Sequence, residues 1–106
     1  MAEPPTGLDL RADQWAMVEA ILRRHLPDRE VWAFGSRTKG TAKPYSDLDL
    51  AVLGEQPLAL STQAALTDDF AESDLPWRVD VVDWSTTSAS FRDIISAHRI
   101  RVQPLP

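Results

Sequence analysis

Cysteine is absent from this 106-residue chain, and its absence excludes disulfide bonds and thiolate metal sites. Chains without disulfides are typical of the reducing cytoplasm, so we expect a cytoplasmic location. Long apolar runs are absent as well: no stretch approaches the roughly 20 residues of a membrane-spanning helix, and the N-terminus lacks a signal-peptide pattern. The sequence therefore predicts no association with a membrane.

Positive charge is scarce, because 11 Lys and Arg stand against 16 Asp and Glu, which gives a formal net charge of −5 at pH 7. Proteins that bind nucleic acid stably usually neutralise many phosphates with basic side chains. We therefore expect no stable nucleic-acid binding, whereas a basic protein partner is compatible with this charge.

The length predicts a single domain over residues 1–106. Residues 1–8 contain two prolines and a glycine and are expected to form a loose leader. Hydrophobic periodicity and turn residues predict helices at about 11–26, 36–40 and 59–73, and a short one through Phe91, Ile94 and Ile95. They predict strands at 30–34, 47–53 and 78–84, and a brief extended tail at 100–105. The fold class is thus α/β (α+β): a small mixed sheet with helices packed on one face.

Within the helix at 59–73, Leu60, Ala64 and Phe70 are the expected inward positions. Successive strand residues point to opposite faces of a sheet. Asp47 and Asp49 therefore share one face, opposite the aliphatic residues of the same strand, and Asp80 takes the corresponding face of the strand at 78–84. If helices cover the aliphatic face, all three carboxylates emerge on the uncovered face.

Three carboxylates on one exposed face indicate a site for hard divalent cations. Two metal ions about 3.5–4 Å apart can stabilise both the attacking and the leaving oxygen of a phosphoryl or nucleotidyl transfer. An all-oxygen donor set suits two Mg²⁺ ions, with Mn²⁺ possible. Asp47, Asp49 and Asp80 are accordingly the candidate metal ligands and catalytic residues, and Asp80 is also a possible base.

Ten residues separate a Gly-Ser turn from Asp47, and the turn offers backbone N–H groups and a hydroxyl to a phosphate chain. Gly35 permits a close backbone approach, Ser36 is the expected N-cap of a short helix, and Gly40 ends that helix. Arg37 and Lys39 add positive charge nearby, where either contacts phosphate or is simply solvated. Gly35, Ser36 and Arg37 are the candidate nucleotide-binding residues.

Other residues have less specific readings. Asp83 is three residues after Asp80 and therefore points to the opposite face of the strand, so we expect it to cap a turn. The tryptophans are expected mainly in the core, although Trp84 could flank a nucleobase or a partner. His25 and His98 are expected at the surface or at a partner rather than on a metal.

The segments Phe34-Gly35-Ser36-Arg37, Asp47-Leu48-Asp49-Leu50 and Val79-Asp80-Val81-Val82-Asp83 together resemble the minimal nucleotidyltransferases (MNT), the smallest of the polymerase-beta-type nucleotidyltransferases. The resemblance implies a polymerase-beta-like fold, an active site of three aspartates and ATP as substrate. It further implies a HEPN-domain ribonuclease toxin as partner in a hetero-oligomer. In such toxin–antitoxin pairs the MNT protein is the antitoxin, and it transfers AMP to a tyrosine of the toxin.

Two alternatives remain open. One is a catalytically silent antitoxin that inhibits its toxin by binding alone. The other is a small-molecule nucleotidyltransferase similar to those that modify aminoglycosides, although such enzymes usually carry an additional helical domain.

Overall fold

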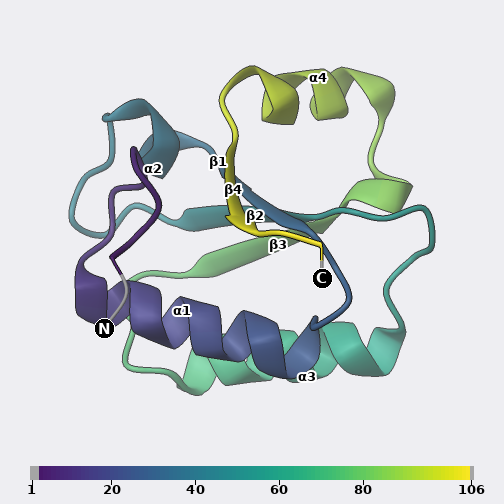
Figure 1. Cartoon of the computed structure of the whole chain (residues 1–106), viewed down its shortest axis with the longest axis horizontal. Helices are drawn as coiled ribbons and strands as arrows, with labels where there is room; N and C mark the ends of the chain where they lie inside the picture. The colour runs from purple at the N-terminus through teal and green to yellow at the C-terminus, as the bar shows by residue number, and fades with distance from the viewer. Residues whose placement is uncertain (1–2, 106) are drawn as a thin grey trace.

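Four strands form a mixed sheet in the order β3-β2-β1-β4 (Figure 1). The computed structural model describes residues 3–105. Its strands are β1 (Val31–Phe34), β2 (Leu48–Val52), β3 (Val79–Asp83) and β4 (Ile100–Gln103). Its α-helices are α1 (Ala12–His25), α2 (Ser36–Lys39), α3 (Leu60–Glu72) and α4 (Ala89–Ala97), and a 3₁₀ turn spans Trp84–Thr86. The predicted elements and the mixed sheet are thereby confirmed.

β1 runs antiparallel to both β2 and β4, whereas β2 and β3 run parallel. The chain beyond residue 99 was expected to be only an extended tail, but β4 is a fourth strand on the free edge of β1. Its amides pair with a strand that precedes it by more than 60 residues, and a local pattern cannot reveal such a partner. In the parallel pair Asp49 lies opposite Asp80, which brings two of the candidate ligands side by side.

α1 and α3 cover one face of the sheet (Figure 1). Apolar residues at helical spacing bury the inner side of α1: Trp15, Val18, Ile21 and Leu22. The aliphatic residues Leu48, Leu50 and Val52 of β2 face the same core and are almost fully buried. In α3 the buried residues are Leu66 and Phe70. Leu60 and Ala64 are exposed, so their predicted inward positions were wrong.

α4 packs on the opposite face of the sheet, so the prediction that helices occupy one face only was wrong (Figure 1). Ile95 of α4 is fully buried against Phe34 and Ala51. Phe91 meets Phe34 edge to face, with ring centroids 5.8 Å apart. This half of the face is apolar, because β1 and β2 present Phe34 and Ala51 there instead of carboxylates, and it requires a cover. Ile94 faces outward and is 60% exposed.

The N-terminal segment is partly anchored, which corrects the expected loose leader at residues 1–8. Leu8 is buried in the core beside α1, and the Asp9 amide donates to the Arg37 carbonyl at 2.9 Å. Residues 1 and 2 lie outside the described residues. Within residues 3–105 no helix has the length and apolar character that a membrane crossing requires.

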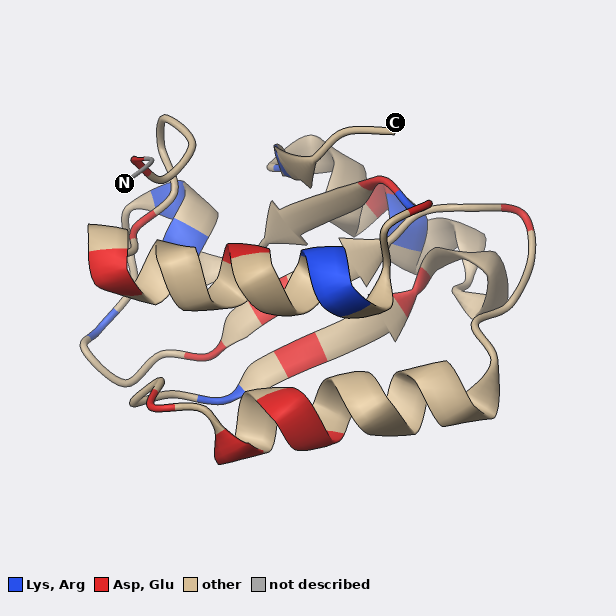
Figure 2. Cartoon of the chain, turned by 60° about the horizontal axis from the view of Figure 1, so that its bottom comes forward, with Lys and Arg blue, Asp and Glu red and all other residues tan. Residues whose placement is uncertain are grey.

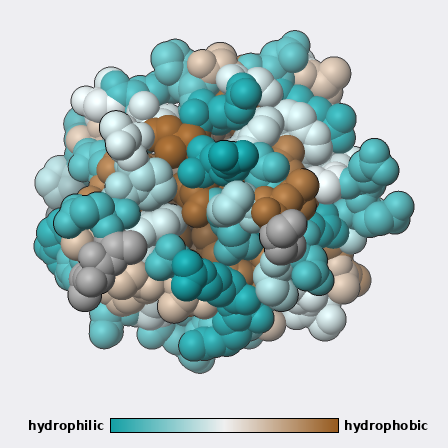
Figure 3. All heavy atoms as spheres, in the orientation of Figure 1, coloured by the Kyte–Doolittle hydropathy of each residue, from teal (hydrophilic) through white to brown (hydrophobic). Residues whose placement is uncertain are grey.

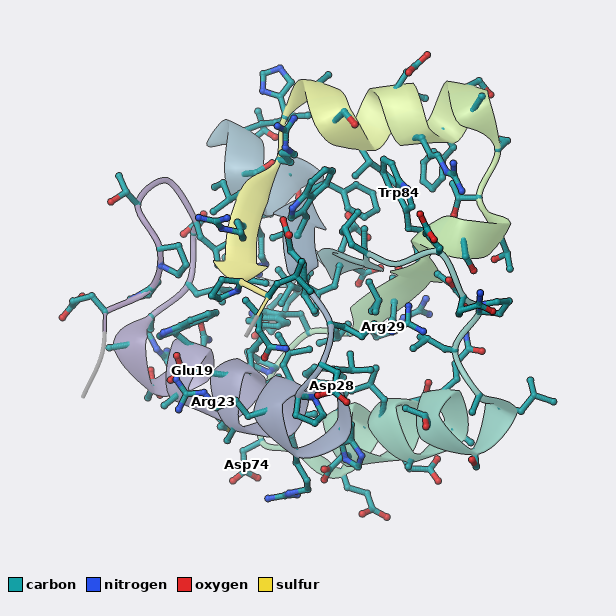
Figure 4. All side chains as sticks on the ribbon, turned by 45° about the vertical axis from the view of Figure 1, so that its right-hand side comes forward. Glu19, Arg23, Asp28, Arg29, Asp74 and Trp84 are labelled. Carbon is teal, nitrogen blue, oxygen red and sulfur yellow. The ribbon has the colours of Figure 1, made fainter. Side chains whose placement is uncertain are left out.

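The face drawn in Figure 3 is mainly hydrophilic, and apolar residues are visible in the middle of the view. Acidic residues lie on neighbouring strands and near the end of α3 (Figure 2). On α1, Glu19 and Arg23 lie side by side and form an ion pair of 3.2 Å (Figure 4). Such exposed pairs contribute only about 0.3–0.5 kcal/mol each. The stability of the fold therefore comes mainly from the two apolar clusters that pack on the two faces of the sheet.

Candidate functional site

The three candidate carboxylates belong to one end of one sheet face. Asp49 and Asp80 are register partners on β2 and β3, and Asp47 precedes Asp49 by two residues. Leu48, Leu50 and Val81 point the other way into the main core. Because α4 covers the far ends of these strands, the ends that carry the carboxylates keep contact with solvent; the Asp80 side chain is 46% exposed. The structure thus gives Asp47, Asp49 and Asp80 the shared face that strand parity predicts.

The environment of Asp49 disfavours its ionised form. Burial, then the negative charge of Asp80, then that of Asp47 raise its pKa from 3.8 to about 6. Desolvation and neighbouring like charges both disfavour the ionised form of a carboxyl group. The carboxylates are therefore close enough to repel one another, which is the situation that a bound cation relieves.

Gly35 forms the wall next to Asp49. Its φ is +83°, a left-handed value that glycine adopts without strain. A Cβ at this position would overlap the Oδ2 atom of Asp49, so the backbone of the turn packs directly on the carboxylate. Any side chain at position 35 would separate the turn from the carboxylates, and this contact explains the glycine.

The short helix α2 follows that turn and begins one residue away from the prediction. Gly35 is the N-cap and Ser36 is the first helical residue, whereas Ser36 was expected to be the cap. The Thr38 hydroxyl donates to the Gly35 carbonyl at 2.7 Å and holds the turn closed. Gly40 ends the helix in the left-handed conformation, as predicted.

Arg37 is a buried residue, only 4% exposed, and does not extend towards solvent beside the turn. Its guanidinium donates to the carbonyls of Asp9, Lys43, Pro44 and Ser46, at 2.9–3.4 Å. It also stacks on the Trp77 ring, 4.5 Å from the centroid. Burial lowers the pKa of Arg37, and the charges of Asp9 and Asp47 oppose that change. These contacts favour a structural role over the predicted phosphate contact, because its donors already have acceptors.

Asp83 caps the turn after β3, as its parity indicates. Its carboxylate accepts from the Leu58 amide at 2.8 Å and from the amide and hydroxyl of Ser85. Burial acts to raise the pKa of Asp83, but these hydrogen bonds outweigh it and hold the pKa below the usual value. The side chain joins two loops and lies apart from the three carboxylates.

Trp84 packs against α4 (Figure 4). Its ring meets Trp32 edge to face, with centroids 5.4 Å apart, and Arg92 stacks on it at 5.0 Å. These contacts place Trp84 in the apolar cluster between the sheet and α4, in agreement with the prediction that the tryptophans lie mainly in the core. His25 contacts Asp69 at 2.8 Å and so joins α1 to α3.

A groove of about 700 Å³ lies beside β3 and α3 and reaches two of the three carboxylates. Its lining includes Tyr45, Asp47, Phe70, Leu75, Trp77 and Asp80. The sequence analysis did not identify this groove, because its walls come from three segments that only the fold brings together. The groove combines apolar side chains with the carboxylates of Asp47 and Asp80. Such a lining is typical of a site that takes an aromatic or aliphatic group with a polar atom.

The donor set of the site fits a hard divalent cation. All candidate ligands are carboxylate oxygens, which Mg²⁺ and Mn²⁺ prefer, and burial together with the charges of Asp80 and Asp47 raises the pKa of Asp49. Within residues 3–105, no three Asp, Glu or His side chains, Asp47, Asp49 and Asp80 included, lie close enough together to hold a metal ion by themselves. Magnesium usually takes one or two carboxylates and completes its shell with substrate phosphates and water, so a complete cage is not required.

Solved structures with the same fold include toxin–antitoxin complexes. A chain of a toxin–antitoxin crystal structure with AMP-PNP matches with a TM-score of 0.70 and 27% identity, over 83% of this chain and 71% of that chain. A structure of a tri-AMPylated HEPN toxin from Shewanella oneidensis in complex with its MNT antitoxin matches with a TM-score of 0.63 and 26% identity. That match covers 83% of this chain and 67% of the other.

Sequence comparison agrees with the structural similarity. The probable protein adenylyltransferase MntA of Haemophilus influenzae is 52% identical over 96 residues, which cover 91% of this chain and 84% of MntA. The family model of the nucleotidyltransferase domain matches residues 16–103, a range that contains the Gly-Ser turn and all three carboxylates. The chain therefore belongs to the nucleotidyltransferase domain family.

Proposed function

We propose that this protein is a Mg²⁺-dependent protein adenylyltransferase and the antitoxin of a HEPN/MNT pair, which transfers AMP from ATP to a tyrosine of its HEPN toxin. The observation that carries the proposal is the pairing of Asp49 with Asp80, beside Asp47, directly against the Gly35 turn. The 52% identity to a probable protein adenylyltransferase supports the reaction. The matched structures, one with AMP-PNP and one with an AMPylated HEPN toxin, support ATP and the toxin as substrates.

Asp47, Asp49 and Asp80 would hold the metal, which when bound neutralises the charge of the triphosphate and of the leaving pyrophosphate. Gly35 and Ser36 would receive the β- and γ-phosphates through the amides at the start of α2 and the Ser36 hydroxyl. The contact between the Gly35 backbone and Asp49 fixes this phosphate turn beside the carboxylates. Positioning of this kind accounts for most of the catalysis in phosphoryl transfer.

The acceptor hydroxyl would approach from the groove beside β3. Asp80 lines this groove and is about half exposed, so it can accept the proton of an incoming hydroxyl. The oxygen then attacks the α-phosphorus, the bond to the β-phosphate breaks, and pyrophosphate leaves. Aromatic and aliphatic walls, among them Phe70 and Trp77, suit a tyrosine ring better than a polar sugar.

The experiment is incubation of the protein with ATP, Mg²⁺ and its cognate HEPN protein, followed by intact-mass spectrometry. We expect the HEPN protein to gain mass in units of AMP, and Asp49→Asn to abolish the gain. Asp28→Asn, an exposed aspartate in the loop after α1, is the matched control and should retain the activity (Figure 4). An unmodified HEPN protein that is nonetheless fully inhibited in a stoichiometric complex would support a silent antitoxin and contradict the proposal.

A further inference from the structure

Tyr45 is the single tyrosine of the chain and one of its most exposed large side chains, at 76%. Among residues 3–105 its hydroxyl makes no hydrogen bond, and its ring stacks on no other aromatic or cationic group. A side chain that is 76% exposed gains little from apolar burial in folding. The phenol of Tyr45 is therefore accessible to a ligand or a partner.

The backbone that carries Tyr45 is held firmly. The Ser46 amide donates to the Lys43 carbonyl at 3.1 Å, and the Ser46 hydroxyl accepts from the Lys43 amide at 2.8 Å. Pro44 and Tyr45 thus occupy the central positions of a turn, where proline at the first position is favourable. The Arg37 guanidinium donates hydrogen bonds to the carbonyls of Lys43, Pro44 and Ser46 in this turn. The ring is consequently presented from a fixed turn.

That turn places Tyr45 at the carboxylate groove. Tyr45 lines the groove together with Asp47 and Asp80, and it also lines the adjoining hollow of about 520 Å³ that contains Arg37 and Lys43. It precedes Asp47 by only two residues, so the phenol and the carboxylates belong to one short segment and one groove. A phenol in this place occupies the side from which an acceptor hydroxyl approaches.

We propose that Tyr45 is a self-adenylylation site, which accepts AMP from ATP bound to the same chain when no partner fills the groove. The inference rests on the proposed transfer reaction. The phenolic oxygen of Tyr45 forms a bond to the α-phosphorus, the bond between the α-phosphorus and the bridging oxygen of the β-phosphate breaks, and pyrophosphate leaves. The phenolic proton passes to the Asp80 carboxylate. The product is a tyrosyl-AMP phosphodiester at the mouth of the groove.

The modification has a direct consequence for the partner. AMP on Tyr45 adds a negative phosphodiester and a nucleoside next to Asp47 and Asp80, where the acceptor side chain of the partner has to enter. Self-modified protein is expected to modify a partner more slowly than unmodified protein, by at least about tenfold, since one group fills the space that the other requires.

The test compares wild type and Tyr45→Phe, each incubated alone with ATP and Mg²⁺ and analysed by intact mass and peptide fragmentation. Phe keeps the ring and removes only the nucleophilic oxygen, and equal melting temperatures will show that the fold is retained. We expect wild type to gain one AMP on Tyr45 and Tyr45→Phe to gain none. Equal gain by both proteins, or AMP on another residue, would overturn the proposal.

A mixture of the Asp49→Asn and Tyr45→Phe proteins tests whether transfer occurs within one chain. The first keeps the phenol and the second keeps the carboxylates, so transfer within one chain predicts that neither gains mass. AMP on the Asp49→Asn chain would overturn transfer within the chain.

A parallel reaction with the HEPN partner separates this inference from the proposed function. AMP on the partner but never on wild-type protein incubated alone would overturn self-modification and leave the proposed function standing. AMP on neither protein would overturn both.

Discussion

Replacement of Asp49 by Asn should stabilise the metal-free fold while it abolishes catalysis. Burial and the charges of Asp80 and Asp47 raise the pKa of Asp49 from 3.8 to about 6. Holding the ionised carboxylate at pH 7 costs the folded state up to about 3 kcal/mol, at about 1.4 kcal/mol for each pKa unit. The side chain is partly exposed, and solvent screening reduces this to about 1–2 kcal/mol. Asparagine keeps the shape and removes the charge.

The sign of the pH dependence follows from the direction of the shift. Above pH 6 the folded state carries the full cost of the ionised carboxylate, and the cost disappears as the pH falls from about 6 to 3.8, because the folded state binds the proton first. The advantage of Asp49→Asn should therefore be largest at pH 7 and vanish near pH 4.

Urea unfolding at pH 7 with a chelator measures this effect, and Asp28→Asn, at an exposed position, should change stability by less than about 0.5 kcal/mol. Added Mg²⁺ should then stabilise wild type and leave Asp49→Asn unchanged, because ligands that bind only the folded state raise its stability. An Asp49→Asn protein that is less stable than wild type at pH 7 without metal would refute the reasoning.

Three further substitutions test the surroundings of the site. Asp83→Asn should cost about 1–3 kcal/mol by weakening the cap on Leu58 and Ser85, and the wild-type advantage in unfolding experiments should disappear as the pH falls below about 4, because the pKa of Asp83 is depressed. Gly35→Ala should weaken ATP binding, measured by calorimetry, by tenfold or more, because its Cβ would overlap Asp49; unchanged affinity would contradict the assigned turn. Arg37→Met should lower the free energy of unfolding by about 3 kcal/mol, because several buried carbonyls lose their donor, and a loss of ATP affinity without a loss of stability would instead favour phosphate contact.

Strand parity allowed the carboxylate face to be predicted, because side chains alternate with a period of two whatever the neighbouring strand is. Asp47, Asp49 and Asp80 share a face for that reason, and Asp83 does not. The register that places Asp49 beside Asp80 could not be predicted, since it depends on the pairing of segments about 30 residues apart.

Features that depend on distant contacts were missed. β4 is short and has its partner in β1, so its sequence alone looks like a tail. The role of Arg37 was invisible because its acceptors are backbone carbonyls, which leave no trace in residue identity. Helical spacing also gave a wrong prediction for α3, where Leu60 is the first residue of the helix and is 84% exposed.

The most direct test of the central claim is a crystal structure with Mn²⁺ and a non-hydrolysable ATP analogue, in which anomalous scattering locates the metal. We predict an anomalous peak bounded by the carboxylates of Asp47, Asp49 and Asp80, with the β- and γ-phosphates against residues 35–40. A metal and triphosphate bound elsewhere on the protein, with these carboxylates free, would contradict the account.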